Sequence, residues 1–311
     1  MQLPIPLIAD QFLSSKAKNL YGSSRKQTTI ADQVSVSGFG FWSGRDVTLT
    51  LVPSTADSGI VFVRTDLPGQ PRIPAVIQNR ADGPRRTTLV ANGSTVEMVE
   101  HVLAALAGMR IDNCEIHVDR AEMPGCDGSS LAFTDALSKT TVVELESTRR
   151  VIRVESTIRV GTDDAWIEAQ PIDGDQLELT YCLDYQCRAI GQQTTTSIIT
   201  PENFANNIAA ARTFVLLEEA NEFKKLGIGK RVTNQDVIVF DDHGPLDNNE
   251  LRFQDECARH KLLDMVGDFS LSGADLIGKI TANRSGHRLN SQMVFALLQQ
   301  NVKIYPSRMS A

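Results

Sequence analysis

The 311-residue sequence has little cysteine, no long apolar run and no excess of basic residues. Its five cysteines are scattered and lack CxxC spacing, so a reduced, cytoplasmic protein is expected rather than a disulfide framework. No apolar run approaches the roughly 20 residues that span a bilayer, and an integral membrane segment is not expected. The formal net charge of -7 argues against non-specific binding to nucleic acid, so no nucleic-acid partner is expected.

Several common active-site motifs are also missing. Neither of the glycine-rich phosphate-binding patterns, GxGxxG and GxxxxGK[ST], appears, and the HExxH pattern of zinc proteases is absent. The residues from Met1 to Ala9 lack the basic start of a secretory signal. The composition, 41% hydrophobic and 22% charged, is that of an ordinary globular protein. The chain is long enough for one large or two medium domains.

The order of predicted elements divides the chain into two similar parts. Residues 1–26 show no clear period and are expected to form an N-terminal appendage. Residues 27–147 and 148–311 each begin with strand patterns and continue with helical ones, and the strand pattern restarts near residues 146–150. Two such units predict an α+β fold in which two layers face each other.

Local signals place individual elements. A first helix is predicted to open at Ser94, because Ser94-Thr95-Val96-Glu97 has the form of a capping box, and His101 would then lie in mid-helix. Thr200 is predicted to cap another helix with Pro201 at its first position. Further strands are predicted at 28–30, 34–38, 46–52, 60–64, 114–118, 151–160, 165–169, 176–184, 192–199, 237–240 and 277–282, and further helices at 131–137, 257–268 and 290–300.

The predicted helix over residues 257–268 carries candidate metal ligands. His260 and Asp264 are four residues apart and therefore lie on the same side of a helix, and Asp268 is one further turn along. Apolar residues occupy the rest of the helix surface, which predicts burial. Buried imidazole and carboxylate groups are costly unless they bind something, so a metal ion is one interpretation. A surface helix with a simple His–Asp hydrogen bond is the other.

A metal site would need more groups, and Glu100 and His101 are candidates. His101 would complete the three protein ligands typical of catalytic zinc, which keeps a fourth position for water, although a histidine among apolar neighbours is often a core residue. Glu100 could serve as general base without binding the metal.

Two further residues could complete a hydrolytic site. His287 is predicted on a turn after a strand, where it could protonate a leaving amine; a solvated loop histidine is the alternative. The Thr213 hydroxyl could stabilise an oxyanion, and a simple cap is equally compatible with its position. His117 and His243 receive no functional role.

Several separated motifs occur together and in a fixed order. They are Val99-Glu100-His101, Ala104 to Asn113, Ala211-Arg212-Thr213-Phe214, Arg259 to Asp264, and Ser285-Gly286-His287. With these motifs the chain resembles the UDP-3-O-acyl-N-acetylglucosamine deacetylase family, the zinc enzymes of lipid A biosynthesis, over about residues 26 to 303. The resemblance implies two similar domains, each a sheet with two helices, packed helix layer to helix layer in a β-α-α-β sandwich.

The resemblance also implies a function and a set of roles. The substrate would be a UDP-linked acylated glucosamine, from which zinc chemistry (ferrous iron is the alternative metal) removes acetate, and the protein would be a monomer. The implied roles are metal ligands His101, His260 and Asp264, general base Glu100, general acid His287, orienting residue Asp268, oxyanion group Thr213, and substrate contacts Lys261, Phe214 and Arg284.

Some positions depart from the family pattern. Trp42 stands where the family usually has histidine in a GxGLHSG turn, and Arg231-Val232-Thr233 replaces the usual Gly-Gly-Ser. These departures leave the acyl-chain length open. Two rival hypotheses are a deacetylase of another N-acetylated sugar nucleotide and a non-catalytic binding protein on the same fold. Retention of both Glu100 and His287 argues against the second, because a binding protein needs neither an acid nor a base.

Overall fold

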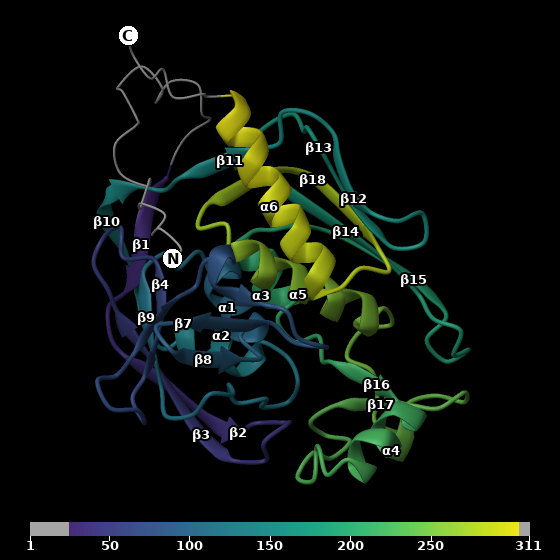
Figure 1. Cartoon of the computed structure of the whole chain (residues 1–311). Coiled ribbons are helices and arrows are strands. Elements are labelled where there is room, and N and C mark those ends of the chain that lie inside the picture. The colour runs from purple at the N-terminus through teal and green to yellow at the C-terminus, as the bar shows by residue number, and fades with distance from the viewer. Residues whose placement is uncertain (1–24, 305–311) are drawn as a thin grey trace, which may run out of the picture.

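The structure, a computed structural model, describes residues 25–304 and contains two main sheets with the same strand order (Figure 1). The first sheet has the order β2-β3-β9-β4-β5 and the second β12-β13-β18-β14-β15. In the first sheet the bounds are β2 Val34–Phe39, β3 Asp46–Pro53, β4 Ile60–Arg64, β5 Arg72–Pro74 and β9 Cys114–Val118. In the second they are β12 Ile158–Gly161, β13 Trp166–Gln170, β14 Leu177–Asp184, β15 Gln192–Ile198 and β18 Asp275–Asn283.

Strand directions repeat as well. In both sheets the strand that comes last along the chain occupies the centre, antiparallel to one neighbour and parallel to the other. A short additional strand, β11 (Val151–Arg153), also pairs with β18 in parallel. Sequence identity between the two halves is too low to indicate a duplication. Their common strand order does indicate one.

Each half has one core helix directly before the central strand of its sheet and one after it. In the first half these are α1 (Glu100–Gly108) and α2 (Leu131–Leu137), and in the second α5 (Glu256–Ser270) and α6 (His287–Ile304). Figure 1 shows α1 and α5 in the middle of the molecule, between the sheet that contains β3 and β9 and the sheet that contains β14 and β18. The predicted β-α-α-β sandwich is therefore confirmed.

A glycine allows α1 and α5 to approach closely. A Cβ atom added to Gly267 of α5 would lie only 2.1 Å from the carbonyl oxygen of Glu100, at the start of α1. No side chain fits in that space, so the helix backbones can touch only with glycine at this position. This contact sets the spacing between the residues that α1 and α5 contribute to the site.

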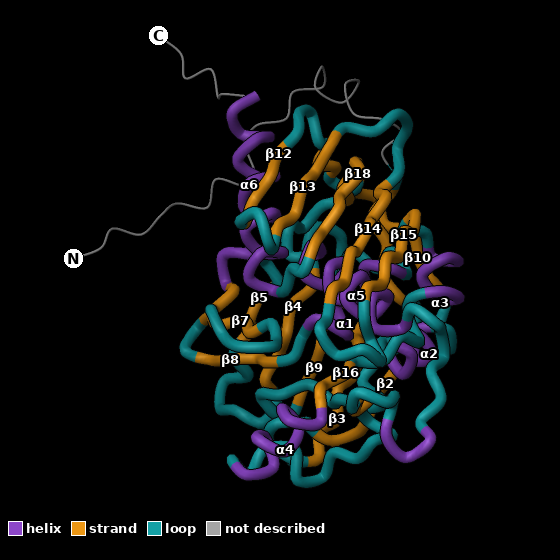
Figure 2. Tube along the Cα trace, turned by 90° about the vertical axis from the view of Figure 1, so that its right-hand side faces the viewer, coloured by secondary structure: helices purple, strands orange, loops and turns teal. Residues whose placement is uncertain are grey.

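Each half also carries an insertion between its fourth main strand and its first core helix. The first insertion contains the short helix η2 (Ile77–Asn79) and a small sheet of β6 (Arg80–Ala81), β7 (Thr88–Ala91) and β8 (Ser94–Glu97). The second contains α3 (Pro201–Asn207), β16 (Phe214–Leu216), α4 (Leu217–Lys225), β17 (Ile238–Phe240) and η3 (Leu246–Asn248). Figures 1 and 2 both place α4 at the lower end of the molecule, near the level of β3. None of the residues of α4 is buried.

Several local predictions match the structure. The strand predicted over 114–118 and the helix predicted over 131–137 coincide with β9 and α2. Thr200 caps α3 as predicted, because its side chain accepts a hydrogen bond from the backbone N–H of Asn203 at 3.1 Å.

The helix predicted to open at Ser94 is wrong. Ser94 and Val96 are buried while the residues between and after them are half-buried, a two-residue period that suits pairing of β8 with β7. Met98 then adopts a positive φ of 59°, which separates the strand from α1. His101 consequently lies in the first turn of α1 and not in its middle.

The start of the last helix also differs from the prediction. Asn290 donates its backbone N–H to the carbonyl of Gly286 at 3.0 Å, so helical hydrogen bonding begins before residue 290. His287 is the first residue of α6, whereas the sequence predicted it on a turn. A helix terminus fixes the backbone of His287 more firmly than a loop would.

Charged residues connect the two halves. Arg25 donates to Asp112, just before β9, and to Asp275 of β18, each at 2.8 Å. Arg149 lies 3.1 Å from Asp112 and 3.2 Å from Asp275. Nearby, β1 (Lys26–Ile30) pairs antiparallel with β10 (Val142–Thr148). We propose that the domain boundary lies here, near residue 147.

The appendage expected over residues 1–26 falls, up to residue 24, outside the described residues. Within residues 25–304, no helix combines the length and apolar character needed to cross a membrane.

Candidate active site

His101 from α1 and His260 and Asp264 from α5 converge on one point. One potential ligand atom from each lies within 4.8 Å of the others, and all three residues are buried. Nε2 of His260 is 3.4 Å and Nε2 of His101 is 3.8 Å from Oδ1 of Asp264. The two imidazole rings stand nearly perpendicular, with centroids 5.1 Å apart. The i,i+4 spacing on α5 and the close contact with α1 together produce this cluster.

Hydrogen bonds on the outer side of the cluster orient its atoms. Nδ1 of His260 lies 3.1 Å from the carbonyl oxygen of Ala211; a carbonyl only accepts, so Nδ1 carries the proton and Nε2 a free lone pair. Lys261 donates to Oδ2 of Asp264 at 2.8 Å. Oδ1 of Asp264 and Nδ1 of His101 are buried, and neither has a hydrogen-bond partner among the described residues.

These atoms fit a bound cation. The facing atoms of His260 and Asp264 are electron-rich acceptors, and bringing them together without a donor costs free energy. A divalent metal ion bound between the three residues would accept electron pairs from these atoms. Two imidazoles with one carboxylate are a common donor set for such ions.

The protonation states of the three residues suit the same role. Burial, together with the nearby His260, lowers the pKa of His101 to about 3. The pKa of His260 is also lowered, chiefly by burial. Burial would raise the pKa of Asp264, but His260 and Lys261 outweigh it, and the pKa lies below its ordinary value. Neutral imidazoles and an ionised carboxylate are the forms that bind metal ions.

Glu100 lies beside this cluster as the first residue of α1. Its Oε2 accepts a hydrogen bond from the backbone N–H of Thr87 at 3.0 Å. Burial raises the pKa of Glu100 to about 7, although the charge of His287 lowers it in part. A carboxyl group with this pKa can accept and return a proton near neutral pH.

His287 is held by a second acidic residue. Its Nδ1 lies 2.8 Å from Oδ2 of Asp268, and its Nε2 lies 3.8 Å from Oε1 of Glu100. Burial alone would lower the pKa of His287, but the charge and hydrogen bond of Asp268, with a contribution from Glu100, raise it to about 9. The imidazole is therefore positively charged near neutral pH, with its Nε2 proton on the side of Glu100.

Two residues that the sequence did not indicate hold Asp268. The hydroxyl of Thr87 donates to Oδ1 of Asp268 at 2.5 Å, and Nδ2 of Asn290 donates to Oδ2 at 2.8 Å. Thr87 thus contacts Glu100 through its backbone and Asp268 through its side chain. It lies between short strands of an insertion, where no periodic pattern could have indicated its role.

Residues 211–213, which precede β16, lie next to the cluster of His101, His260 and Asp264. Thr213 lines the same cavity as His260, and its backbone N–H donates to the carbonyl of Gly128 at 2.8 Å. Its neighbour Arg212 is buried and bonds to buried Glu256 through both its backbone and its guanidinium group, at 2.8–3.1 Å. This ion pair fixes the Ala211 carbonyl that orients His260.

The cluster opens into a cavity of about 950 Å³. One part of its lining contains the cluster of His101, His260 and Asp264 together with Glu100 and His287, and another part is largely apolar. The apolar lining comes mainly from α4, β16, β17 and the loop between α4 and β17, and includes Phe214, Leu217, Phe223, Ile228, Val232 and Val239.

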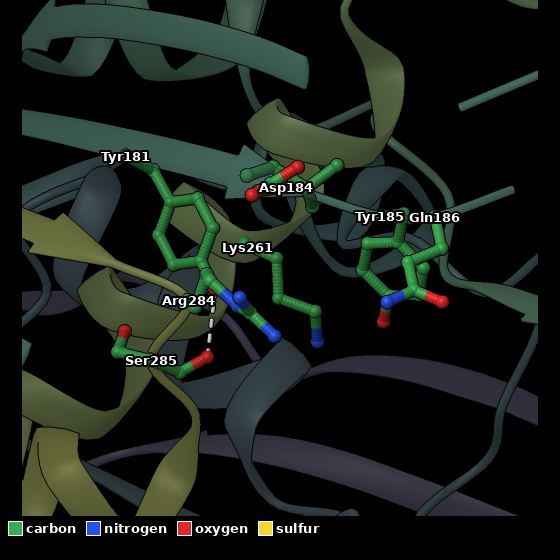
Figure 3. A pocket seen from close by; sticks show the side chains of 8 residues that line it. Tyr181, Asp184, Tyr185, Gln186, Lys261, Arg284 and Ser285 are labelled. Carbon is green, nitrogen blue, oxygen red and sulfur yellow. Dashed lines mark hydrogen bonds between the residues drawn. The ribbon is translucent and has the colours of Figure 1, made fainter. Parts of the chain in front are cut away.

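A smaller cavity of about 410 Å³ adjoins Lys261 and contains positive charge and aromatic rings (Figure 3). Lys261 comes from α5 and Arg284 from the turn after β18. Tyr181 comes from β14, and Tyr185 directly follows that strand. Figure 3 shows the charged ends of Lys261 and Arg284 extending in the same direction. Tyr181 is fixed by donating to the carbonyl of Ser285 at 2.6 Å. The sequence had not indicated the two tyrosines.

The structure brings together all ten residues predicted for the site. The predicted contacts Lys261 and Arg284 line both cavities, and Phe214 lies under Lys261, with Nζ 5.9 Å from the ring centroid. His117, by contrast, lies on β9 and bonds to Glu115, and His243 is exposed in a turn. Neither lines either cavity.

Comparisons with known proteins agree with this geometry. The sequence model of the family described as UDP-3-O-acyl N-acetylglycosamine deacetylase matches residues 27–299. The chain is 40% identical over 266 residues to the UDP-3-O-acyl-N-acetylglucosamine deacetylase of Oleidesulfovibrio alaskensis, covering 85% of this chain and 86% of that protein. It is 35% identical over 274 residues to the same enzyme of Brucella melitensis, covering 88% and 95%. The chain therefore belongs to the UDP-3-O-acyl N-acetylglycosamine deacetylase family.

Proposed function

We propose that the protein is a metal-dependent amidase that removes acetate from the 2-acetamido group of UDP-3-O-acyl-N-acetylglucosamine, a step of lipid A biosynthesis. The observation that carries this proposal is the convergence of a three-residue acceptor cluster with a carboxylate and a charged imidazole in one cavity. Amide hydrolysis needs an activated water molecule, a group to hold the oxyanion and a proton for the leaving nitrogen.

His101, His260 and Asp264 would hold the metal ion, and zinc is the proposed metal. Zinc favours imidazole and carboxylate ligands with one position left open, and ferrous iron accepts the same donor set. When bound, the ion would polarise the amide carbonyl and lower the pKa of a water molecule.

Glu100 and His287 would divide the proton transfers. Glu100 would take the proton from the attacking water, for which its raised pKa suits it. His287 would give its Nε2 proton to the departing nitrogen, because an amine leaves poorly as its anion. Asp268 keeps that imidazole charged and oriented through Nδ1. Thr213 would donate to the oxyanion of the tetrahedral intermediate.

The two cavities suit the two ends of the substrate. The smaller one offers Lys261 and Arg284 for a diphosphate and the ring of Tyr185 for stacking on a base. The larger one offers an apolar wall, with Phe214 beside Lys261, for an acyl chain. A negatively charged protein can bind this anionic substrate because the positive charge is local.

Acetate release from UDP-3-O-acyl-N-acetylglucosamine tests the proposal. Metal-loaded protein should release one acetate for each free amine formed, and Glu100→Gln, which is close in size but cannot act as a base, should be nearly inactive. Release from UDP-N-acetylglucosamine but not from the acylated substrate would instead favour a deacetylase of another sugar nucleotide. No release from either would favour a binding protein.

A further inference from the structure

Two departures from the family pattern, Trp42 and Arg231, lie on segments that contact each other, although 188 residues separate them in the chain. Trp42 lies in the turn between β2 and β3, and Arg231 lies in the loop after α4. Nη1 of Arg231 lies 2.7 Å from Asp46 and 2.9 Å from the carbonyl of Gly44, both at the same turn. The Arg231 guanidinium also stacks 4.4 Å over the ring of Phe39.

A second set of contacts connects the same two segments. The ring of Trp42 packs edge-on against Phe223 of α4, with centroids 5.5 Å apart. Arg86 stacks 4.3 Å over Trp42, and Arg85 stacks 5.0 Å over Phe223. Arg85 also pairs with Glu219 of α4 at 2.6 Å. We call the contacts of Trp42, Phe223, Arg85, Arg86, Phe39 and Arg231 the turn–helix bridge.

The turn holds Trp42 in one place. Buried Glu122 accepts from the backbone N–H of Trp42 at 2.7 Å and from that of Ser43 at 2.8 Å. A Cβ atom at Gly40 would lie 2.2 Å from the same carboxylate, so the turn fits closely around it. The backbone that carries the indole ring is therefore fixed relative to the first half of the protein.

Helix α4, in contrast, has no fully buried residue. It packs on β16 and β17 and is joined to the β2–β3 turn by the turn–helix bridge. Trp42, Phe223 and Arg85 all line the large cavity that also contains the metal-ligand cluster. The bridge thus connects the β2–β3 turn with α4 at the lining of this cavity.

We propose that the ring pair of Trp42 and Phe223 is the wall that limits the length of the acyl chain the cavity accepts, and that Arg231 holds this wall closed. This inference rests on the proposed function, because it assigns the apolar part of the cavity to the acyl chain. Trp42 is then a specificity-determining residue, which acts on the substrate's chain and not on its amide.

Acetate release from substrates whose acyl chains lengthen by two methylenes at a time tests the proposal. Trp42→Ala should raise kcat/KM for chains beyond the wild-type cut-off, relative to short chains, by about 15-fold per step of two methylenes, since each newly buried methylene is worth about fourfold. Trp42→Phe keeps a ring and should retain most of the wild-type ratio. Leu226→Ala, an exposed position one residue beyond α4, is the matched control and should leave the ratio unchanged.

The possible outcomes are distinct. If the wild type is active and Trp42→Ala leaves the ratio of kcat/KM between long and short chains unchanged, the ring pair does not limit chain length. The proposed function would still stand. A wild type that is inactive on every member of the series would overturn both. Should Trp42→Ala fail to fold, Phe223→Ala removes the other ring and must produce the same shift, and an unchanged ratio there would count equally against the wall.

Discussion

His287 and Asp268 form a charged pair in which Nδ1 of the imidazole lies 2.8 Å from Oδ2 of the carboxylate. The two residues lie on different helices, α6 and α5, and both are held by neighbours that fix their orientation. The pair keeps Nδ1 of the imidazole occupied, and Nε2 lies on the side of Glu100. Its charge state should therefore govern how activity depends on pH.

Replacing Asp268 with asparagine should move the alkaline limb of the activity profile to lower pH. Asp268 raises the pKa of His287 to about 9, so the acid form is present below that pH and is lost as the pH rises through it. Without the carboxylate charge the pKa should fall by at least about one unit. Measurement of kcat against pH checks this, and an alkaline limb that stays in place would show that another group titrates there.

Removing the imidazole with His287→Ala should lower kcat by about 10²-fold or more, the usual contribution of one acid–base group. The metal content should not change, because His287 is not among the three ligands. His243→Ala, at an exposed turn, is the matched control and should behave as wild type. Near-normal turnover in His287→Ala would transfer the acid role to Glu100.

Metal binding and proton transfer should be separable by mutation. Asp264→Ala should lose the metal, because the two remaining histidines hold an ion weakly. Glu100→Ala should keep the metal and lose turnover. Metal analysis of both purified proteins decides the matter: a metal-free Glu100 variant, or a fully loaded Asp264 variant, would reverse the assigned roles.

The approach of α5 to α1 should tolerate no side chain at Gly267. Gly267→Ala places a methyl group 2.1 Å from the Glu100 carbonyl and should lower the free energy of unfolding by about 1–3 kcal/mol, the usual cost of overpacking. It should also lower activity, since these two helices carry the proposed metal ligands His101, His260 and Asp264. Gly83→Ala, which has no contact closer than 3.7 Å, is the control for urea unfolding. Equal stability of the two variants would contradict the close contact.

Periodic patterns and motif spacing predicted much of this structure. The i,i+4 spacing of His260 and Asp264 indicated a shared helix face, and both residues are buried on α5. Capping at Thr200 was predicted because Thr-Pro is a strong local signal. Such signals depend only on neighbouring residues, and a sequence displays them directly.

The wrong helix prediction at Ser94 and the residue roles that were not predicted depend on contacts between distant parts of the chain. Ser94-Thr95-Val96-Glu97 satisfies a capping box locally, but pairing with β7 and burial of alternate residues favour a strand. The roles of Thr87 and Tyr185 depend on contacts with residues far away in the chain. The meeting of Trp42 with Phe223 depends on how the β2–β3 turn packs against the second insertion. No local pattern carries that information.

The central claim, that one metal ion held by His101, His260 and Asp264 is required for deacetylation, is tested most directly by reconstitution. Protein stripped with a chelator should release no acetate from UDP-3-O-acyl-N-acetylglucosamine. Stepwise addition of zinc should restore activity in proportion, up to one equivalent per chain, and Asp264→Ala should recover none at that ratio. Full activity in protein shown to be metal-free, or equal recovery by Asp264→Ala at one equivalent, would contradict the claim.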